Sequence, residues 1–121
     1  MNGGFSRTAG AHWFLQRITA LVLVVGLFVH FLVLHYMFDR GSGSLVFEDV
    51  RTRLSHPGWI AFDLALLACA IYHGLNGIYG IILDYNPARS GKSLAAWFLW
   101  LAGLATFFIG AWVLIPFTSG K

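Results

Sequence analysis

Three long apolar segments divide the chain, and short polar stretches separate them. The segments run from about Trp13 to Phe38, from Gly58 to Leu83 and from Ser93 to Phe117. Each is longer than the ~20 residues that a helix needs to cross a hydrocarbon core about 30 Å thick. Because lipid offers no hydrogen-bond partners to the backbone, we expect all three segments to be membrane-spanning helices.

The polar stretches between the segments predict how the helices are connected. Residues 39–57 open with a Gly/Ser-rich turn and continue as a short amphipathic piece that we expect on the membrane surface. Residues 84–92 contain Pro87 and Gly91, which is typical of a short loop. Short connections place successive helices antiparallel. The sequence therefore predicts an all-α transmembrane fold, in which residues 1–121 form one up-down-up bundle of three helices.

Composition agrees with a lipid environment and excludes several classes of protein. Hydrophobic residues make up 58% of the chain and charged residues 11%, whereas soluble domains have about a quarter charged residues. The single cysteine, Cys69, excludes an internal disulfide and a cysteine-based metal cluster. The net charge of +3 comes without a basic run, so nothing suggests nucleic acid binding. Basic residues are shared equally between the two predicted membrane faces, so charge does not fix the orientation.

Ionisable side chains inside the spans are the first candidates for function, because burying them in lipid is costly. The candidates are Arg17, His30, Asp63 and His73. His73 lies 11 residues before Asp84, so it is roughly 16 Å from that membrane edge at a rise of ~1.5 Å per residue. A neutral imidazole at this depth needs a partner, and haem iron is one that binds it well.

The neighbours of His73 leave two interpretations open. Small residues at Ala70, Gly74, Gly77 and Gly80 would let a flat macrocycle approach the helix. The same residues are equally typical of a groove for helix packing, with the histidine hydrogen-bonded to a neighbouring helix.

A second candidate site lies at the edge of the membrane. Antiparallel packing would bring Arg17 to the face that carries Asp84 and Tyr85. A phenol that donates and a carboxylate that accepts could bind the carbonyl oxygens of a quinone and relay protons. The alternatives are a snorkelling arginine, an interfacial tyrosine and an aspartate that ends the helix.

The remaining histidines are weaker candidates. His30 and His35 are five residues apart, about 140° around a helix, so they cannot share one site. Gly26, one turn before His30, would leave room for a second haem. Asp63 and His35 fall at the same face and could pair. We expect His12 and His56 to be solvated.

The stretch "YHGLNGIYGIILDYN" resembles the small membrane-anchor subunits of succinate dehydrogenase, the succinate:quinone oxidoreductase of complex II. The shared pattern is a histidine followed, at the end of the second span, by Asp-Tyr, here His73, Asp84 and Tyr85. The start of the first span, "HWFLQRITALVLV", is also similar, with a histidine, an arginine and a Thr-Ala-rich apolar run.

This resemblance implies roles for the candidate residues. His73 would be an axial ligand of haem b, and a partner anchor subunit would supply the second ligand. Tyr85, with Asp84 beside it, would bind ubiquinone or menaquinone, and Arg17 would lie near the haem propionates or the quinone. His30 stays open as the ligand of a second haem, because the family includes anchors with two haems and with none.

The resemblance also implies partners and a location. Succinate oxidation would occur in a flavoprotein, and an iron–sulfur subunit would pass electrons to the quinone. The anchor would lie in the bacterial inner membrane with its amino terminus in the cytoplasm. A fumarate reductase anchor, another two-haem membrane cytochrome b and a small non-redox membrane protein are the alternatives.

Overall fold

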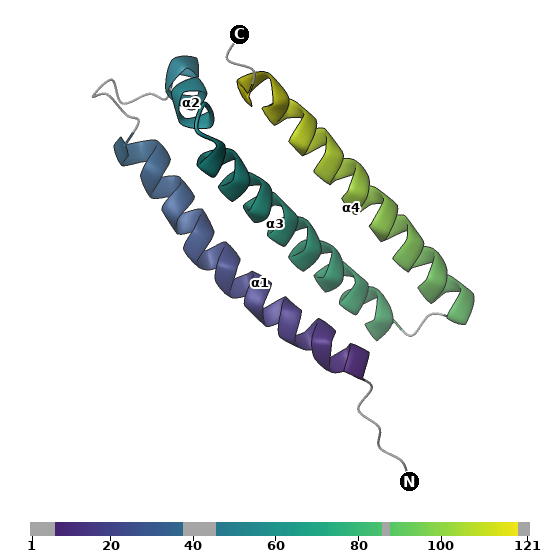
Figure 1. Cartoon of the computed structure of the whole chain (residues 1–121). Helices are drawn as coiled ribbons and strands as arrows, with labels where there is room; N and C mark the ends of the chain where they lie inside the picture. Colours follow the sequence, from purple (N-terminus) through teal and green to yellow (C-terminus); the bar gives the residue numbers. More distant parts are fainter. Residues whose placement is uncertain (1–6, 38–45, 86–87, 119–121) are drawn as a thin grey trace.

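The computed structural model describes residues 7–37, 46–85 and 88–118, and three long helices dominate it (Figure 1). Helix α1 covers Arg7–Leu32 and continues into a π-helical turn, η1, at Val33–Met37. Helix α3 covers Pro57–Asp84 and α4 covers Arg89–Thr118. All three are long and apolar enough to cross a membrane. The three predicted spans are therefore confirmed, and the described residues contain no strand.

The helix ends follow from local chemistry. Pro57 begins α3, where a residue without an N–H costs no helical hydrogen bond. Helix α4 starts at Arg89, four residues before the predicted Ser93. Polar residues form this extra turn, in which the Lys92 N–H donates to the Ala88 carbonyl oxygen at 3.1 Å. Helix α4 is therefore longer at its start than the apolar segment predicted.

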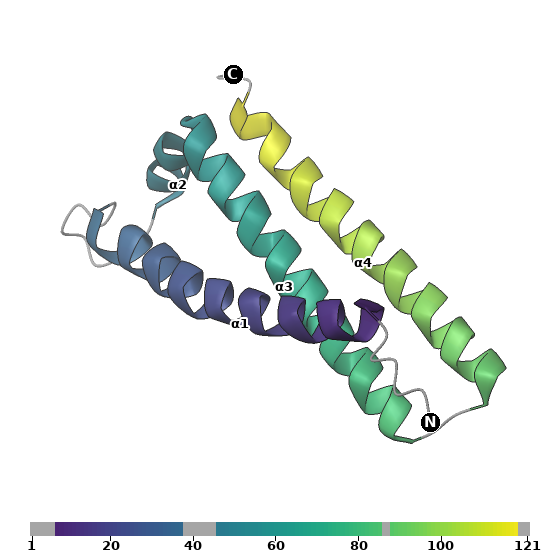
Figure 2. The same cartoon turned by 60° about the horizontal axis from the view of Figure 1, so that its bottom comes forward.

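The three helices form an open layer with α3 in the middle. Helices α1 and α4 each pack against α3 and, over the described residues, not against each other. Neighbouring helices run antiparallel, as predicted, and α1 crosses α3 at an angle while α4 runs beside it (Figures 1 and 2). Large apolar side chains such as Phe28 and Trp112 stay exposed. Both faces of the layer are therefore available to lipid or to other subunits.

Glycines allow the helices to approach closely. A β-carbon at Gly103 of α4 would lie 2.5 Å from Leu75 Cδ1 of α3. At Gly26 of α1 an added β-carbon would collide with the Leu66 side chain. Small residues at such contacts are the usual means of packing helices in membranes. The room that Gly26 was predicted to leave for a second haem near His30 is therefore filled by Leu66.

A short helix, α2 (Phe47–Leu54), packs against α3 and α4 at one end of the layer. The predicted amphipathic piece is thus a helix, but its buried residues include the charged Asp49 and Arg53. The Asp49 carboxylate accepts a hydrogen bond from the Val46 N–H at 3.3 Å, which stabilises the first turn. Phe47 stays exposed. The side of α2 that faces the protein thus carries Asp49, Arg53 and Leu54.

Candidate functional site

His73 lies at the contact between α1 and α3 and is half-buried. Its Nδ1 atom is 3.3 Å from the backbone carbonyl oxygen of Gln16 and 3.3 Å from Oγ1 of Thr19. Both partners belong to α1, and Thr19 is only 9% exposed. Nδ1 of His73 therefore has hydrogen-bond partners on a neighbouring helix, as one of the two open interpretations expects.

Side-chain amides extend this contact into a four-residue polar cluster, Gln16, Thr19, His73 and Asn76. The Gln16 Nε2 atom donates to the His73 carbonyl oxygen at 3.2 Å. The Gln16 Oε1 atom accepts from Asn76 Nδ2 at 2.8 Å. Sequence reasoning missed the two amides and the role of Thr19, because it looked for charges. The spacing could have revealed them, since each helix contributes polar residues at i and i+3.

The contacts around His73 favour one tautomer of the neutral ring. A carbonyl oxygen can only accept, so the contact with Gln16 requires a proton on Nδ1. The Thr19 hydroxyl already donates to the Leu15 carbonyl oxygen at 2.8 Å, which leaves its oxygen free to accept from His73. In the neutral ring, Nε2 therefore carries the lone pair and is the nitrogen that can bind a metal.

The glycines of α3 leave space around His73. A β-carbon built on Gly74 or Gly80 would meet nothing within 4 Å, and at Gly77 it would meet only Gln16 Nε2, at 3.7 Å. These three positions do not mediate close packing within the described chain, unlike Gly103 on α4. They leave open surface along the helix that carries His73. Across the described ranges, no three or more His, Cys, Asp or Glu side chains converge on one point.

Arg17 does not join Asp84 and Tyr85. Its neighbour Gln16 is level with His73, 11 residues before Asp84 along α3. The Arg17 guanidinium lies 4.2 Å from the centroid of the Trp13 ring, a cation–π contact within α1. Asp84 ends α3, and Tyr85, just beyond it, is 84% exposed. The structure thus separates the arginine from the acid–phenol pair by depth.

The opposite end of the layer holds a charged cluster. Arg53 of α2 makes two hydrogen bonds of 2.6 Å to the Asp63 carboxylate of α3. His30 of α1 places Nδ1 3.3 Å from Asp63 Oδ1. Arg53 and His30 are therefore the neighbours of the Asp63 carboxylate. The predicted partner, His35, instead packs its ring on Phe31. The role of His30 as ligand of a second haem stays a prediction.

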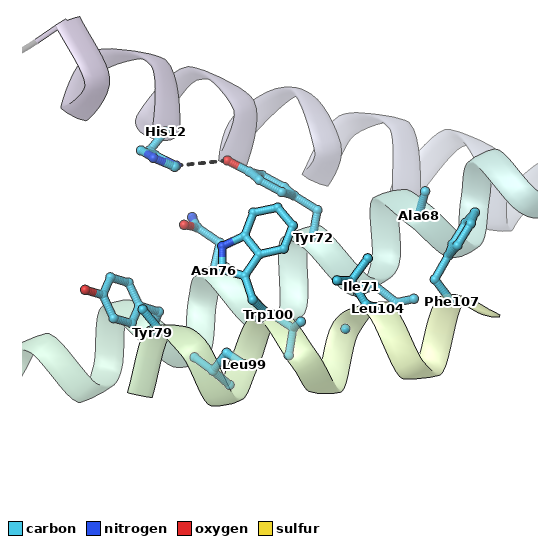
Figure 3. Close-up of a pocket in the computed structure, with 13 residues that line it drawn as sticks. His12, Ala68, Ile71, Tyr72, Asn76, Tyr79, Leu99, Trp100, Leu104 and Phe107 are labelled. Carbon is cyan, nitrogen blue, oxygen red and sulfur yellow. Dashed lines mark hydrogen bonds between the residues drawn. The ribbon is translucent and has the colours of Figure 1, made fainter. Parts of the chain in front are cut away.

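A hollow of about 440 Å³ opens between α3 and α4 (Figure 3). Aromatic side chains line it, among them Tyr72, Tyr79, Trp100 and Phe107. The Tyr72 hydroxyl lies 3.2 Å from Nδ1 of His12, which was predicted to be merely solvated. The hollow is polar near His12 and apolar near Phe107, as Figure 3 shows.

Comparison with known proteins identifies the family. Residues 3–111 match the family described as succinate dehydrogenase/fumarate reductase transmembrane subunit. A succinate dehydrogenase hydrophobic membrane anchor subunit of Archaeoglobus fulgidus is 30% identical over 102 residues, which is 84% of this chain and 85% of that protein. The subunit of the same description in Thermoplasma acidophilum is 35% identical over 79 residues, 65% of this chain and 63% of its own length. One from Rickettsia prowazekii is 26% identical over 84 residues, 69% of this chain and 63% of its own length. With three membrane-spanning helices and a family match over most of its length, this chain belongs to the succinate dehydrogenase/fumarate reductase transmembrane subunits and is a hydrophobic membrane anchor subunit.

Proposed function

We propose that this anchor subunit binds haem b through Nε2 of His73 and helps to form the site at which quinone is reduced. One observation carries the haem assignment. The Gln16 carbonyl oxygen holds the proton of His73 on Nδ1, which leaves the Nε2 lone pair for iron.

The surroundings of His73 fit a macrocycle. Gly74 and Gly80 leave open space on the same helix. His73 would hold the haem iron from this chain, and a second membrane-anchor subunit sharing the haem would hold it from the other side. A haem held in this way would supply one-electron transfer rather than oxygen chemistry.

Of the two roles expected for Arg17, we propose the one near the haem propionates, because Arg17 lies apart from Asp84 and Tyr85, where we place the quinone. Arg17 lies at the same depth as His73, because Gln16 and Thr19 on either side of it contact that histidine. A guanidinium binds carboxylates with two parallel hydrogen bonds. Its contact with the Trp13 ring leaves the N–H groups at the edge of the guanidinium available for such a partner.

Tyr85 and Asp84 are proposed to bind the quinone at the carboxyl end of α3. Both side chains are exposed where the helix leaves the apolar zone. The Tyr85 hydroxyl would donate to a quinone carbonyl oxygen, and the Asp84 carboxylate would accept a proton from water and pass it on. This chain would hold and orient the quinone, while electrons would reach it from an iron–sulfur subunit.

The proposed partners follow from the same function. A flavoprotein subunit would oxidise succinate, an iron–sulfur subunit would carry the electrons, and the anchor would fix both to a bacterial inner membrane. We place the amino terminus in the cytoplasm, so that Tyr85 lies on the side of these two subunits.

The haem assignment is tested by absorption spectroscopy of the purified complex. His73→Ala should remove the haem b signal while the other subunits still co-purify. His35→Ala is the matched control, because His35 lies outside the polar cluster and packs on Phe31. Full haem content in the His73→Ala complex, or an intact wild-type complex without haem, would overturn the assignment.

A further inference from the structure

We propose that Thr19 is a positioning residue, which fixes the ring of His73 and sets how strongly Nε2 donates to a haem iron. The inference rests on the proposed haem function. It adds a residue on a different helix, whose hydroxyl touches neither iron nor quinone and acts through the histidine.

The geometry makes Thr19 an acceptor. Its hydroxyl has one proton, which points to the α1 backbone, 2.8 Å from the Leu15 carbonyl oxygen and 3.2 Å from that of Gln16. The Thr19 oxygen therefore faces His73 with a lone pair, and it lies 3.3 Å from Nδ1. Thr19 is 9% exposed, so water does not compete readily for this bond.

The Nδ1 proton is therefore shared between two acceptors on one helix, the Thr19 hydroxyl and the Gln16 carbonyl oxygen. Acceptors at this position hold the orientation of a metal-bound imidazole and raise its basicity. A more basic ligand favours the oxidised iron and lowers the reduction potential. Removing one acceptor should raise the potential of the haem without removing the haem.

The Gln16 side chain has a different task. It links α1 to the His73 carbonyl oxygen and to Asn76, so it holds the two helices in register. The backbone carbonyl oxygen that accepts from Nδ1 of His73 is present whichever side chain occupies position 16. Gln16→Leu should therefore lower the thermal stability of the complex and leave the haem potential where it is.

The experiment compares Thr19→Val with the wild-type complex, purified with all its subunits. We expect retained haem, a midpoint potential shifted to more positive values and altered electron paramagnetic resonance of the oxidised haem. Thr19→Ser restores the hydroxyl and should restore both signals. Thr106→Val is the matched control, because Thr106 makes the same bond to the carbonyl four residues back, at 2.8 Å, on a helix without His73.

The outcomes separate the two proposals. A wild-type complex without haem overturns the proposed function. A haem-containing Thr19→Val complex with unchanged potential and unchanged resonance overturns the positioning role of Thr19. An equal shift in Thr106→Val also overturns it. If Thr19→Val does not assemble, Thr19→Ala is measured in its place, with the same readings.

Discussion

Arg53 and Asp63 are joined by two parallel hydrogen bonds of 2.6 Å, which tie α2 to the first turns of α3. Arg53 is 2% exposed, and its guanidinium also lies 5.0 Å from the Trp59 ring centroid. A charge buried this deeply is stable only with its partner. The pair therefore fixes the position of α2 over the ends of α3 and α4.

Removing either member of this pair should destabilise the assembled complex. Asp63→Leu should cost about 3–5 kcal/mol, because Arg53 is left buried without its carboxylate. Arg53→Leu should cost less, because His30 Nδ1 still lies 3.3 Å from Asp63 Oδ1. Thermal unfolding of the purified complex measures the loss, and the double substitution Arg53→Leu with Asp63→Leu should recover part of it. Arg51→Ala is the control, since Arg51 pairs with Glu48 at 3.7 Å on the exposed side. A stability of Arg53→Leu equal to that of Arg51→Ala would contradict the structural role.

Gly103 is expected to be needed for the packing of α4 on α3. An added β-carbon would lie 2.5 Å from Leu75 Cδ1 and 3.2 Å from Ile71 Cγ2. Gly103→Ile should therefore push the helices apart and lower the stability by about 1–3 kcal/mol. Ala105→Ile adds the same side chain at an exposed position of α4 and should have little effect. Equal melting temperatures for the two variants would argue against close packing at Gly103.

Gly74 should respond differently, because nothing lies within 4 Å of a β-carbon placed there. Gly74→Ile places a branched side chain in this open space, which also borders Gly103 and Thr106 of α4. We expect a complex that assembles with a reduced haem content, measured by its absorption relative to protein. Gly58→Ile, at another open glycine of α3, should retain haem. Normal haem content in Gly74→Ile would show that the macrocycle does not use this space.

Tyr85→Phe should slow electron transfer to quinone and leave succinate oxidation by an artificial dye unchanged. The loss of one hydrogen bond of about 1 kcal/mol corresponds to a roughly 5-fold lower rate of quinone reduction. Tyr36→Phe is the matched control, an exposed tyrosine toward the other end of the layer. If both variants reduce quinone at the wild-type rate, the Tyr85 hydroxyl takes no part in binding.

The Gln16 amide and the Thr19 hydroxyl show which part of the site depends on the tertiary structure. Gln16 and Thr19 are neutral, so they do not stand out in a span as ionisable residues do. Their importance comes from standing opposite His73, which depends on the register of α1 against α3. The same register placed Arg17 level with His73 rather than with Asp84. Sequence separation along one helix gives depth reliably, but not the alignment between two helices.

The sequence by itself determined the three membrane-spanning helices, their antiparallel order and the depth of His73. These follow from the length of each apolar run and from the obligatory hydrogen bonding of the backbone in lipid. Only the tertiary structure decided the open layer around α3, the partners of His73 on α1 and the Arg53–Asp63 pair. Each of these depends on contacts between residues far apart in the chain, where glycine positions and side-chain shape determine how closely and in which register the helices meet.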